Sequence, residues 1–268
     1  RSREPGTILS EVTTLAGEGY REITLIGQNV DSYNWQDQDG TARRFPWLLE
    51  QVAQTDRRLR IRFATSHPKD LSNEVLEVIS RNANICRHIH LPVQSGSTPL
   101  LKAMNRGYTR EWYLERIDAI RRYLPDAEIS TDIMTGFCGE TEQDHRQSLS
   151  LIEYARYDLA YMFKYSERPG TKAARKMEDD VPEKKKKKRL QEIIELQNSL
   201  SADKKQQSIG KTFQVMVEGP SKKSSQEYYG RNSQNQVVVF PKGNTRPGDF
   251  VDVRISEATP ATLIGQIV

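Results

Sequence analysis

The chain has 268 residues, of which 40 are lysine or arginine and 36 are aspartate or glutamate, giving a formal net charge of +4. At roughly 100–200 residues per domain, this length suggests one large domain and one small one. The slight basic excess permits a polyanionic partner without requiring one. No apolar run approaches the roughly 18 residues of a membrane span. The two distant cysteines do not form a disulfide framework, so we expect a cytoplasmic protein without membrane contact.

Helical and strand patterns alternate over the first two thirds of the chain. Helices are expected at residues 7–16, 47–53, 72–80, 109–124 and 141–154. Short apolar strands are expected at residues 23–26, 61–64, 88–91, 129–133 and 161–164. Apolar positions at helical spacing, with Ser72 and Thr109 as N-caps, mark the helices. This alternation predicts βαβ units and therefore a parallel sheet.

Each expected strand runs directly into a polar turn. These turns are Gly27-Gln28-Asn29, Thr65-Ser66-His67-Pro68, Gln94-Ser95-Gly96-Ser97, Met134-Thr135-Gly136-Phe137 and Tyr165-Ser166-Glu167-Arg168. Ligands bind at the carboxyl ends of parallel strands, in open sheets and in barrels alike. The five turns are therefore the expected rim of a binding site.

The C-terminal third has a different character. A long charged helix is expected over residues 183–208, followed by five short runs rich in β-branched residues. These runs cover residues 212–218, 227–231, 236–240, 250–257 and 262–268. With glycine, proline and asparagine between them, they predict a five-stranded antiparallel barrel. Aromatic side chains alternate there with bases, which favours stacking on nucleobases and pairing with phosphates.

Five strings, taken in order and at their spacings, carry a family resemblance over essentially the whole chain. They are the first ten residues, Gly27-Gln28-Asn29-Val30, Ser66-His67-Pro68-Lys69-Asp70, Met104-Asn105-Arg106-Gly107-Tyr108-Thr109 and Ser166-Glu167-Arg168-Pro169-Gly170-Thr171. The chain resembles the radical S-adenosylmethionine methylthiotransferases, and within them the MiaB-type branch that acts on tRNA. The resemblance implies a radical-SAM core over residues 1–206 and a TRAM domain, a small OB-like RNA-binding β-barrel, over residues 207–268.

The chain departs from the family pattern at the iron–sulfur cluster. The family binds its radical cluster through three cysteines in a CxxxCxxC loop, whereas this chain has only Cys86 and Cys138. It therefore resembles the C-terminal part of such an enzyme. The implied core is a partial (β/α)6 TIM-like half-barrel of five parallel strands without its first strand. We expect this chain alone to be catalytically inert, with no catalytic residue and no metal ligand of its own.

The resemblance also implies where ligands bind. The expected cofactor contacts are Gly27, Gln28, Asn29, Ser66, Gln94, Ser95, Thr131, Asp132 and Gly136. The expected substrate or RNA contacts are His67, His90, Arg106, Tyr228, Tyr229, Arg231, Phe240 and Lys242. In the family, the motif at the position of Gly27-Gln28-Asn29 binds the methionine ammonium of the cofactor. An amide oxygen such as that of Asn29 can accept a hydrogen bond from an ammonium.

Several of these positions have a simpler interpretation. Residues 27–29 can form a turn only, and Asp132 can pair with an arginine because a buried carboxylate needs a partner. His88 and His90 share a strand face, but no third ligand at metal-like spacing joins them. His145 is expected on a polar helix face without a role. The six consecutive bases at 184–189 are expected to be a solvated helix surface rather than a phosphate contact.

The parent enzyme implied by the resemblance converts N6-isopentenyladenosine beside the tRNA anticodon to its 2-methylthio derivative. It uses S-adenosylmethionine and two 4Fe–4S clusters, whose cysteine ligands lie outside this chain, and it needs an electron donor. We expect a monomer. Two alternatives stay open. One is a sibling methylthiotransferase acting on a ribosomal-protein aspartate or on threonylcarbamoyladenosine. The other is a non-catalytic RNA-binding fragment.

Overall fold

The structure is a computed structural model that describes residues 2–64 and 67–268. The chain folds into two units whose segments alternate along the sequence. The first unit comprises Arg1–Ile89, Ile120–Glu128 and Lys205–Val268, and the second comprises His90–Ala119 and Ile129–Lys204. The predicted boundary between domains at residue 206 stays a prediction. No described helix combines the length and the apolar character that crossing a membrane requires.

The first unit begins with an alternation of helices and parallel strands. Its elements are α1 (Pro5–Gly17), β1 (Glu22–Leu25), α2 (Phe45–Thr55), β4 (Arg60–Phe63) and α3 (Asn73–Arg81). Strands β1 and β4 pair in parallel, from Glu22 opposite Arg60 to Leu25 opposite Phe63. The Ser72 side chain accepts from the Val75 N–H and so caps α3, as the sequence predicts.

Short elements after β1 and β4 were not expected. They are the 3-10 turns η1 (Val30–Ser32) and η2 (Pro68–Asp70) and the hairpin strands β2 (Asn34–Gln36) and β3 (Ala42–Arg44). Two strands of three residues carry too few side chains for an alternating pattern to be recognised. The turn at Asp37–Gly40 closes the hairpin, with the Gly40 N–H donating to the Asp37 carbonyl.

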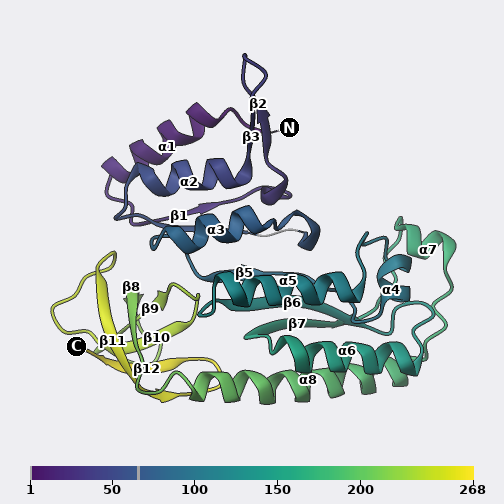
Figure 1. The fold of residues 1–268 in the computed structure, drawn as a ribbon. Coiled ribbons are helices and arrows are strands. Elements are labelled where there is room, and N and C mark those ends of the chain that lie inside the picture. The colour runs from purple at the N-terminus through teal and green to yellow at the C-terminus, as the bar shows by residue number, and fades with distance from the viewer. Residues whose placement is uncertain (1, 65–66) are drawn as a thin grey trace. The chain divides into compact units, whose positions relative to one another are not determined.

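The second unit is built on a three-stranded sheet in the order β5-β6-β7. Its strands are β5 (His88–His90), β6 (Glu128–Thr135) and β7 (Leu159–Lys164); β5 and β6 each begin in the first unit. The helices are α4 (Thr98–Ala103), α5 (Arg110–Tyr123), α6 (Glu142–Ala155), α7 (Lys172–Lys176) and α8 (Glu183–Gln206). All five predicted strands of the α/β region are therefore present, in two sheets, β1-β4 and β5-β6-β7. Figure 1 shows α8 running alongside α6.

The C-terminal strands close into a five-stranded barrel, which confirms the predicted OB-like fold. They are β8 (Thr212–Pro220), β9 (Glu227–Asn232), β10 (Val237–Pro241), β11 (Phe250–Ala258) and β12 (Leu263–Ile267). Their order is β10-β12-β11-β8-β9. Four pairings are antiparallel, and the parallel pairing of β10 with β12 closes the barrel. Gly230 is required at one crossing, because a Cβ there would lie 2.0 Å from the Met216 carbonyl oxygen.

Polar contacts to backbone carbonyls attach this barrel to β4 within the first unit. The buried Arg60 guanidinium donates to the carbonyls of Arg231 and Gln214 at 2.5 and 3.3 Å, and it lies 4.8 Å from the Phe250 ring centroid. Arg62 donates to the Asn232 carbonyl at 3.1 Å. Because these acceptors are main-chain carbonyls, the hydrogen bonds from Arg60 and Arg62 depend on the backbone of the barrel more than on its side chains.

Candidate functional site

The turn after β5 continues the pairing with β6. Gln94 has a φ of 70°, its N–H donates to the Asp132 carbonyl at 2.8 Å, and its carbonyl accepts from the Met134 N–H at 2.8 Å. The buried Thr131 hydroxyl donates to the Leu91 carbonyl at 2.8 Å and accepts from the Val93 N–H at 3.0 Å. Thr131 therefore holds the two strand ends together, and the equally buried Ser95 hydroxyl accepts from the Ser97 N–H within the turn at 3.2 Å. The expectation that these two hydroxyls contact a cofactor is corrected by their burial, whereas the Gln94 side chain is half-exposed.

Asp132 points to the opposite face of β6 and lies beside His90. The His90 Nε2 is 3.7 Å from an Asp132 carboxylate oxygen, and its Nδ1 is 2.9 Å from the Ser130 hydroxyl. The Tyr161 ring meets His90 edge-on at 6.1 Å. Asp132 pairs with no arginine among the described residues, so the structure does not contain the purely structural Asp132–arginine pair that was the alternative to a binding role. Two of the expected binding residues, His90 and Asp132, are thus brought together.

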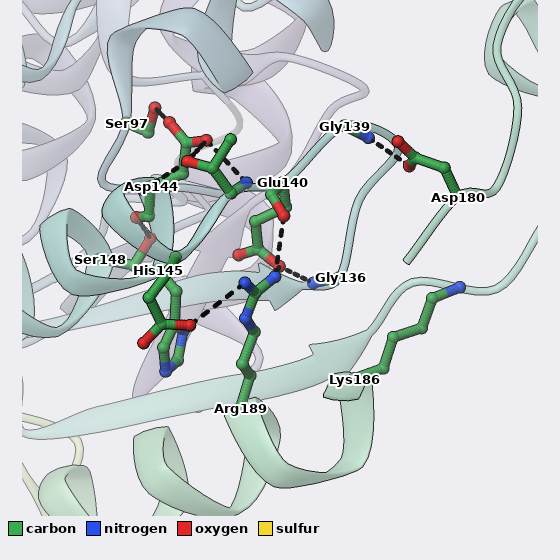
Figure 2. Close-up of polar contacts among 12 residues, drawn as sticks. Ser97, Gly136, Gly139, Glu140, Asp144, His145, Ser148, Asp180, Lys186 and Arg189 are labelled. Carbon is green, nitrogen blue, oxygen red and sulfur yellow. Dashed lines mark hydrogen bonds and ion pairs between the residues drawn. The ribbon is translucent and has the colours of Figure 1, made fainter. Parts of the chain in front are cut away.

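The turn after β6 is held from α8, as Figure 2 shows. Gly136 has a φ of +71°, and a Cβ there would lie 2.3 Å from the Lys186 Cγ. The Lys186 ammonium is 2.5 Å from the Asp179 carboxylate and 5.1 Å from the centroid of the Tyr165 ring. The close approach expected at Gly136 is therefore made by the aliphatic stem of a buried lysine.

A second buried cation on α8 anchors the other end of this turn. The Arg189 guanidinium donates to the Glu140 carboxylate and carbonyl, both at 3.0 Å, and lies 3.4 Å from the Glu142 carboxylate. The Glu140 carboxylate also accepts from the Gly136 N–H. Burial raises the pKa of Glu140, and the hydrogen bond from Gly136 and the charge of Arg189 oppose that rise. The turn is thus held by a hydrogen bond between its own ends, from Gly136 to Glu140, and by Arg189 of α8 (Figure 2).

The expectation of a solvated surface at 184–189 is wrong at two positions. Lys186 is 3% exposed and Arg189 is 2% exposed, whereas the other four bases of this run are exposed. Their spacing from the buried Ile193, Gln197 and Leu200 follows the helical period, so they lie on the buried face of α8. Continuing the buried stripe of α8 from Ile193 towards the N-terminus at helical spacing would have predicted that Lys186 and Arg189 are buried.

His145 was expected on a polar face without a role, and the structure corrects this. The side chain is 1% exposed, and its Nε2 lies 2.6 Å from the Glu192 carboxylate. The neighbouring Asp144 completes the capping box with Thr141 and accepts from the Ser97 hydroxyl. Figure 2 shows Ser97, Asp144 and His145 in this region. They connect the two strand-end turns of the second unit through α6.

The turn after β1, in the first unit, contains buried acceptors without partners. The Asn29 amide nitrogen donates to the Asp70 carboxylate at 2.6 Å, but among the described residues its buried oxygen has no hydrogen-bond partner. Both carboxylate oxygens of the buried Asp31 also lack a partner in the described part of the chain. Burial and the charge of Asp70 raise the pKa of Asp31 to about 7. This arrangement can accept hydrogen bonds from a cation such as an ammonium group.

The remaining predicted contacts are less concentrated. Gly27 and Gln28 are exposed on the same turn. His67 caps η2 by accepting from the Lys69 N–H at 3.4 Å, and Arg106 is half-buried beside Tyr108. Ser66 lies outside the described residues. The predicted cofactor contacts divide between the two units, so their convergence on one pocket stays a prediction.

The barrel corrects two predicted RNA contacts. Phe240 is 0% exposed and Tyr228 is 8% exposed, and both belong to the barrel core. A ring buried in this way has no free face for a nucleobase, so neither residue can stack on RNA. Tyr229 is half-exposed, Lys242 is exposed, and Arg231 pairs with Glu218 at 2.7 Å. The candidate RNA contacts on the barrel are reduced to these three residues.

The chain's own ligands do not fit an iron–sulfur cluster. Cys86 and Cys138 are both buried and free, and they belong to different units. Burial raises the pKa of the Cys86 thiol to about 11, which disfavours the thiolate that binds metal. The described residues include no group of three histidine, cysteine or acidic side chains that could hold a metal ion. The buried oxygens of Asn29 and Asp31, which have no partner among residues 2–64 and 67–268, fit the ammonium of a bound amino acid moiety.

Comparison with known families identifies this α/β architecture. Residues 1–152 match the model of the radical SAM superfamily, and residues 206–268 match that of the TRAM domain. The chain belongs to the radical SAM superfamily, whose cofactors are S-adenosylmethionine and a 4Fe–4S cluster. A solved structure, coproporphyrinogen III oxidase from Escherichia coli, is similar with a TM-score of 0.47 and 14% identity over 69% of this chain and 50% of that one.

Curated relatives carry one name and confirm the resemblance. Over all 268 residues the chain is 58% identical to proteins from Phocaeicola vulgatus and Bacteroides fragilis, covering 59% of each, and 53% identical to one from Porphyromonas gingivalis, covering 58% of it. Each of these relatives is named tRNA-2-methylthio-N(6)-dimethylallyladenosine synthase. The chain spans about three fifths of the length of the curated relatives it matches.

Proposed function

We propose that the chain is part of a tRNA methylthiotransferase that converts N6-isopentenyladenosine beside the anticodon to its 2-methylthio derivative. The observation that carries this proposal is the 58% identity, over the whole chain, to relatives named for that product. The combination of a radical SAM match with a TRAM match in one chain supports it, because it joins a radical cofactor to an RNA-binding barrel.

In this proposal, the residues at the strand ends bind and orient S-adenosylmethionine. Asn29 and Asp31 accept hydrogen bonds from its ammonium. Further expected contacts are Gly27, Gln28, Ser66, Gln94 and Gly136, whereas the fully buried hydroxyls of Ser95 and Thr131 are bonded to the backbone of the strand ends. The bound cofactor supplies the methyl group and the means of starting radical chemistry. The chain's share is orientation and exclusion of water.

The proposed partner is tRNA, held by its phosphates and by one stacked base on the barrel. Arg231 and Lys242 supply charge and Tyr229 supplies an exposed ring, while His67, His90 and Arg106 contact the nucleotide to be modified. An electron donor is a second partner, since radical formation from S-adenosylmethionine needs an electron. The proposed state is a cytoplasmic monomer.

The direct test is mass analysis of tRNA nucleosides. A version of this chain extended to the full length of its relatives is expressed in cells that lack their own methylthiotransferase. We expect 2-methylthio-N6-isopentenyladenosine to appear. The 268-residue chain alone is the control and should give no product, because it has two cysteines where the cluster needs three. A methylthiolated ribosomal-protein aspartate or threonylcarbamoyladenosine, with unchanged isopentenyladenosine, would replace the proposal by a sibling activity.

A further inference from the structure

Three large apolar side chains lie exposed along one face of β7. Leu159, Tyr161 and Phe163 are 48%, 51% and 51% exposed. Because alternate residues of a strand point to the same side, the three form a continuous stripe. The intervening Ala160 is buried on the other face. Packing within the described part of the chain therefore covers one side of β7 and leaves the aromatic side open.

Polar groups lie directly beside this stripe. In the parallel register of β6 and β7, Asp132 is opposite Tyr161 and Met134 is opposite Phe163, so these side chains share a face. His90 lies on it as well, 3.7 Å from Asp132 and edge-on to Tyr161 at 6.1 Å. The face therefore combines two aromatic rings and a leucine with a half-exposed carboxylate–imidazole pair. We call these five residues, Leu159, Tyr161, Phe163, His90 and Asp132, the β7 face.

This combination suits a flat heterocycle that carries an apolar substituent. Aromatic side chains stack on a purine, and Asp132 and His90 can exchange hydrogen bonds with its polar edge. A purine alone would leave much of the stripe in water. The relatives' name specifies adenosine with a dimethylallyl group on N6, a branched apolar substituent that such a stripe can cover.

We propose that the β7 face determines specificity for the N6-dimethylallyl group of the substrate adenosine. Phe163 and Leu159 contact the apolar substituent, Tyr161 stacks beside the purine, and the Asp132–His90 pair orients the polar edge. This inference rests on the proposed function and adds the residues that distinguish a prenylated adenosine from a plain one.

The test compares two anticodon stem–loop RNAs that differ only in the N6-dimethylallyl group. Their dissociation constants are measured for this chain and for a version extended to the full length of its relatives. Phe163→Ala and Leu159→Ala are the test variants, because these two side chains contact the substituent itself, and Phe163→Leu and Leu159→Ile are the conservative ones. The control is Tyr20→Ala, which removes a ring that is 55% exposed in the first unit. Circular dichroism spectra and melting curves establish that each variant folds.

We expect the wild-type protein to prefer the prenylated RNA, and each alanine variant to reduce that preference about five- to tenfold, as removal of apolar pocket contacts does. Binding of the plain RNA should change little, because the barrel contacts are intact. The conservative variants and Tyr20→Ala should keep the preference. If the alanine variants also keep it, or weaken both RNAs equally, the β7 face does not select the substituent, although the proposed function survives. A wild-type protein without any preference overturns the proposed substrate together with this inference.

Discussion

The turns after β6 and after β1 are both polar strand ends, yet they differ in how their buried groups are partnered. At the turn after β6 each buried cation has an anionic partner, Asp179 for Lys186 and Glu140 for Arg189. At the turn after β1, both oxygens of Asp31 and the amide oxygen of Asn29 are buried without partners in the described part of the chain. A polar residue at a strand end can thus belong to the scaffold or be available to a ligand.

The physical difference is the cost of burial. A buried charge with a hydrogen-bonded partner is tolerated, and removing one partner leaves the other uncompensated. A buried acceptor without a partner loses its contacts with water and regains them only when a donor arrives. The turn after β6 should therefore be sensitive to mutation of its cations, whereas the turn after β1 should become more stable when its carboxylate is neutralised.

The largest expected effect comes from Arg189→Met. This change leaves Glu140 buried without its cation, and we expect the free energy of unfolding to fall by about 3–5 kcal/mol. Urea denaturation of the chain, followed by circular dichroism, measures it. Glu140→Gln in the same protein should restore most of the loss. The matched control is Lys188→Met, one residue away on an exposed side chain, and it should cost less than about 0.5 kcal/mol. Equal losses for the two methionine variants would mean that the buried pair does not stabilise this turn.

Asp31→Asn should raise the free energy of unfolding, and the size of this increase should depend on pH. The folded-state pKa of Asp31 is about 7, above that of an unfolded aspartate at about 3.9. Between these values the folded state keeps the proton and the unfolded state has lost it. The wild-type protein should therefore lose stability as the pH rises from about 4 to 7, by up to about 4 kcal/mol. The asparagine variant should not show this loss and should be the more stable protein at pH 8.

Urea titrations at several pH values measure the Asp31 effect. Asp252→Asn, at an exposed barrel position, is the control and should follow the wild-type curve. Parallel curves for the wild type and Asp31→Asn across this range would show that Asp31 is not buried in an unpartnered state.

Gly136→Ala tests the close approach of α8 to the turn. The new methyl group would meet the Lys186 Cγ at 2.3 Å in a backbone conformation that disfavours side chains, so we expect a loss of about 1–3 kcal/mol. Gly139→Ala is the matched control, because Gly139 has a φ of +78° but no atom lies within 4 Å of its added Cβ. It should show only the backbone cost, about 1 kcal/mol. If thermal denaturation gives the same loss for both, the steric contact with Lys186 contributes nothing.

The barrel should give the smallest effect, a change in the salt dependence of tRNA binding. Arg231→Ala together with Lys242→Ala should flatten the log–log slope of affinity against salt by about one to two units, one for each phosphate that the variant no longer neutralises. Tyr229→Ala should weaken binding at every salt concentration with the slope unchanged. Filter binding across a salt series separates the two. An unchanged slope in the double variant would mean that Arg231 and Lys242 do not contact phosphates, and the exposed lysines of α8 would then be the better candidates.

Much of this fold could be predicted from patterns that depend on local sequence. Apolar runs of strand length predicted all five strands of the α/β region, and the caps predicted at Ser72 and Thr109 mark where α3 and α5 begin. The barrel was predictable because β-branched residues recur between turn residues. These signals work because the periods of helix and strand act on neighbouring residues.

The rest depended on which face of an element is buried. The interleaving of aromatic residues with bases, together with the family resemblance, placed Phe240 and Tyr228 among the RNA contacts, although strand alternation turns both side chains into the barrel core. The burial of Lys186 and Arg189 was not predicted, because six consecutive basic residues are typical of a solvated helix surface. The burial of the Asp31 carboxylate could not be predicted at all, since it depends on how β1, η1 and Asp70 are arranged in three dimensions.

We propose that the buried acceptors after β1, Asn29 and Asp31, receive the ammonium of S-adenosylmethionine. Equilibrium dialysis at pH 8, with a version of the chain extended to the full length of its relatives, compares this cofactor with 5′-methylthioadenosine, which lacks the amino acid moiety. We predict that Asn29→Ala weakens binding of S-adenosylmethionine by about tenfold or more, the value of a hydrogen bond to a charged group, and leaves 5′-methylthioadenosine unchanged. Equal binding of S-adenosylmethionine by the variant and the wild type, or an equal loss for both ligands, would contradict the account.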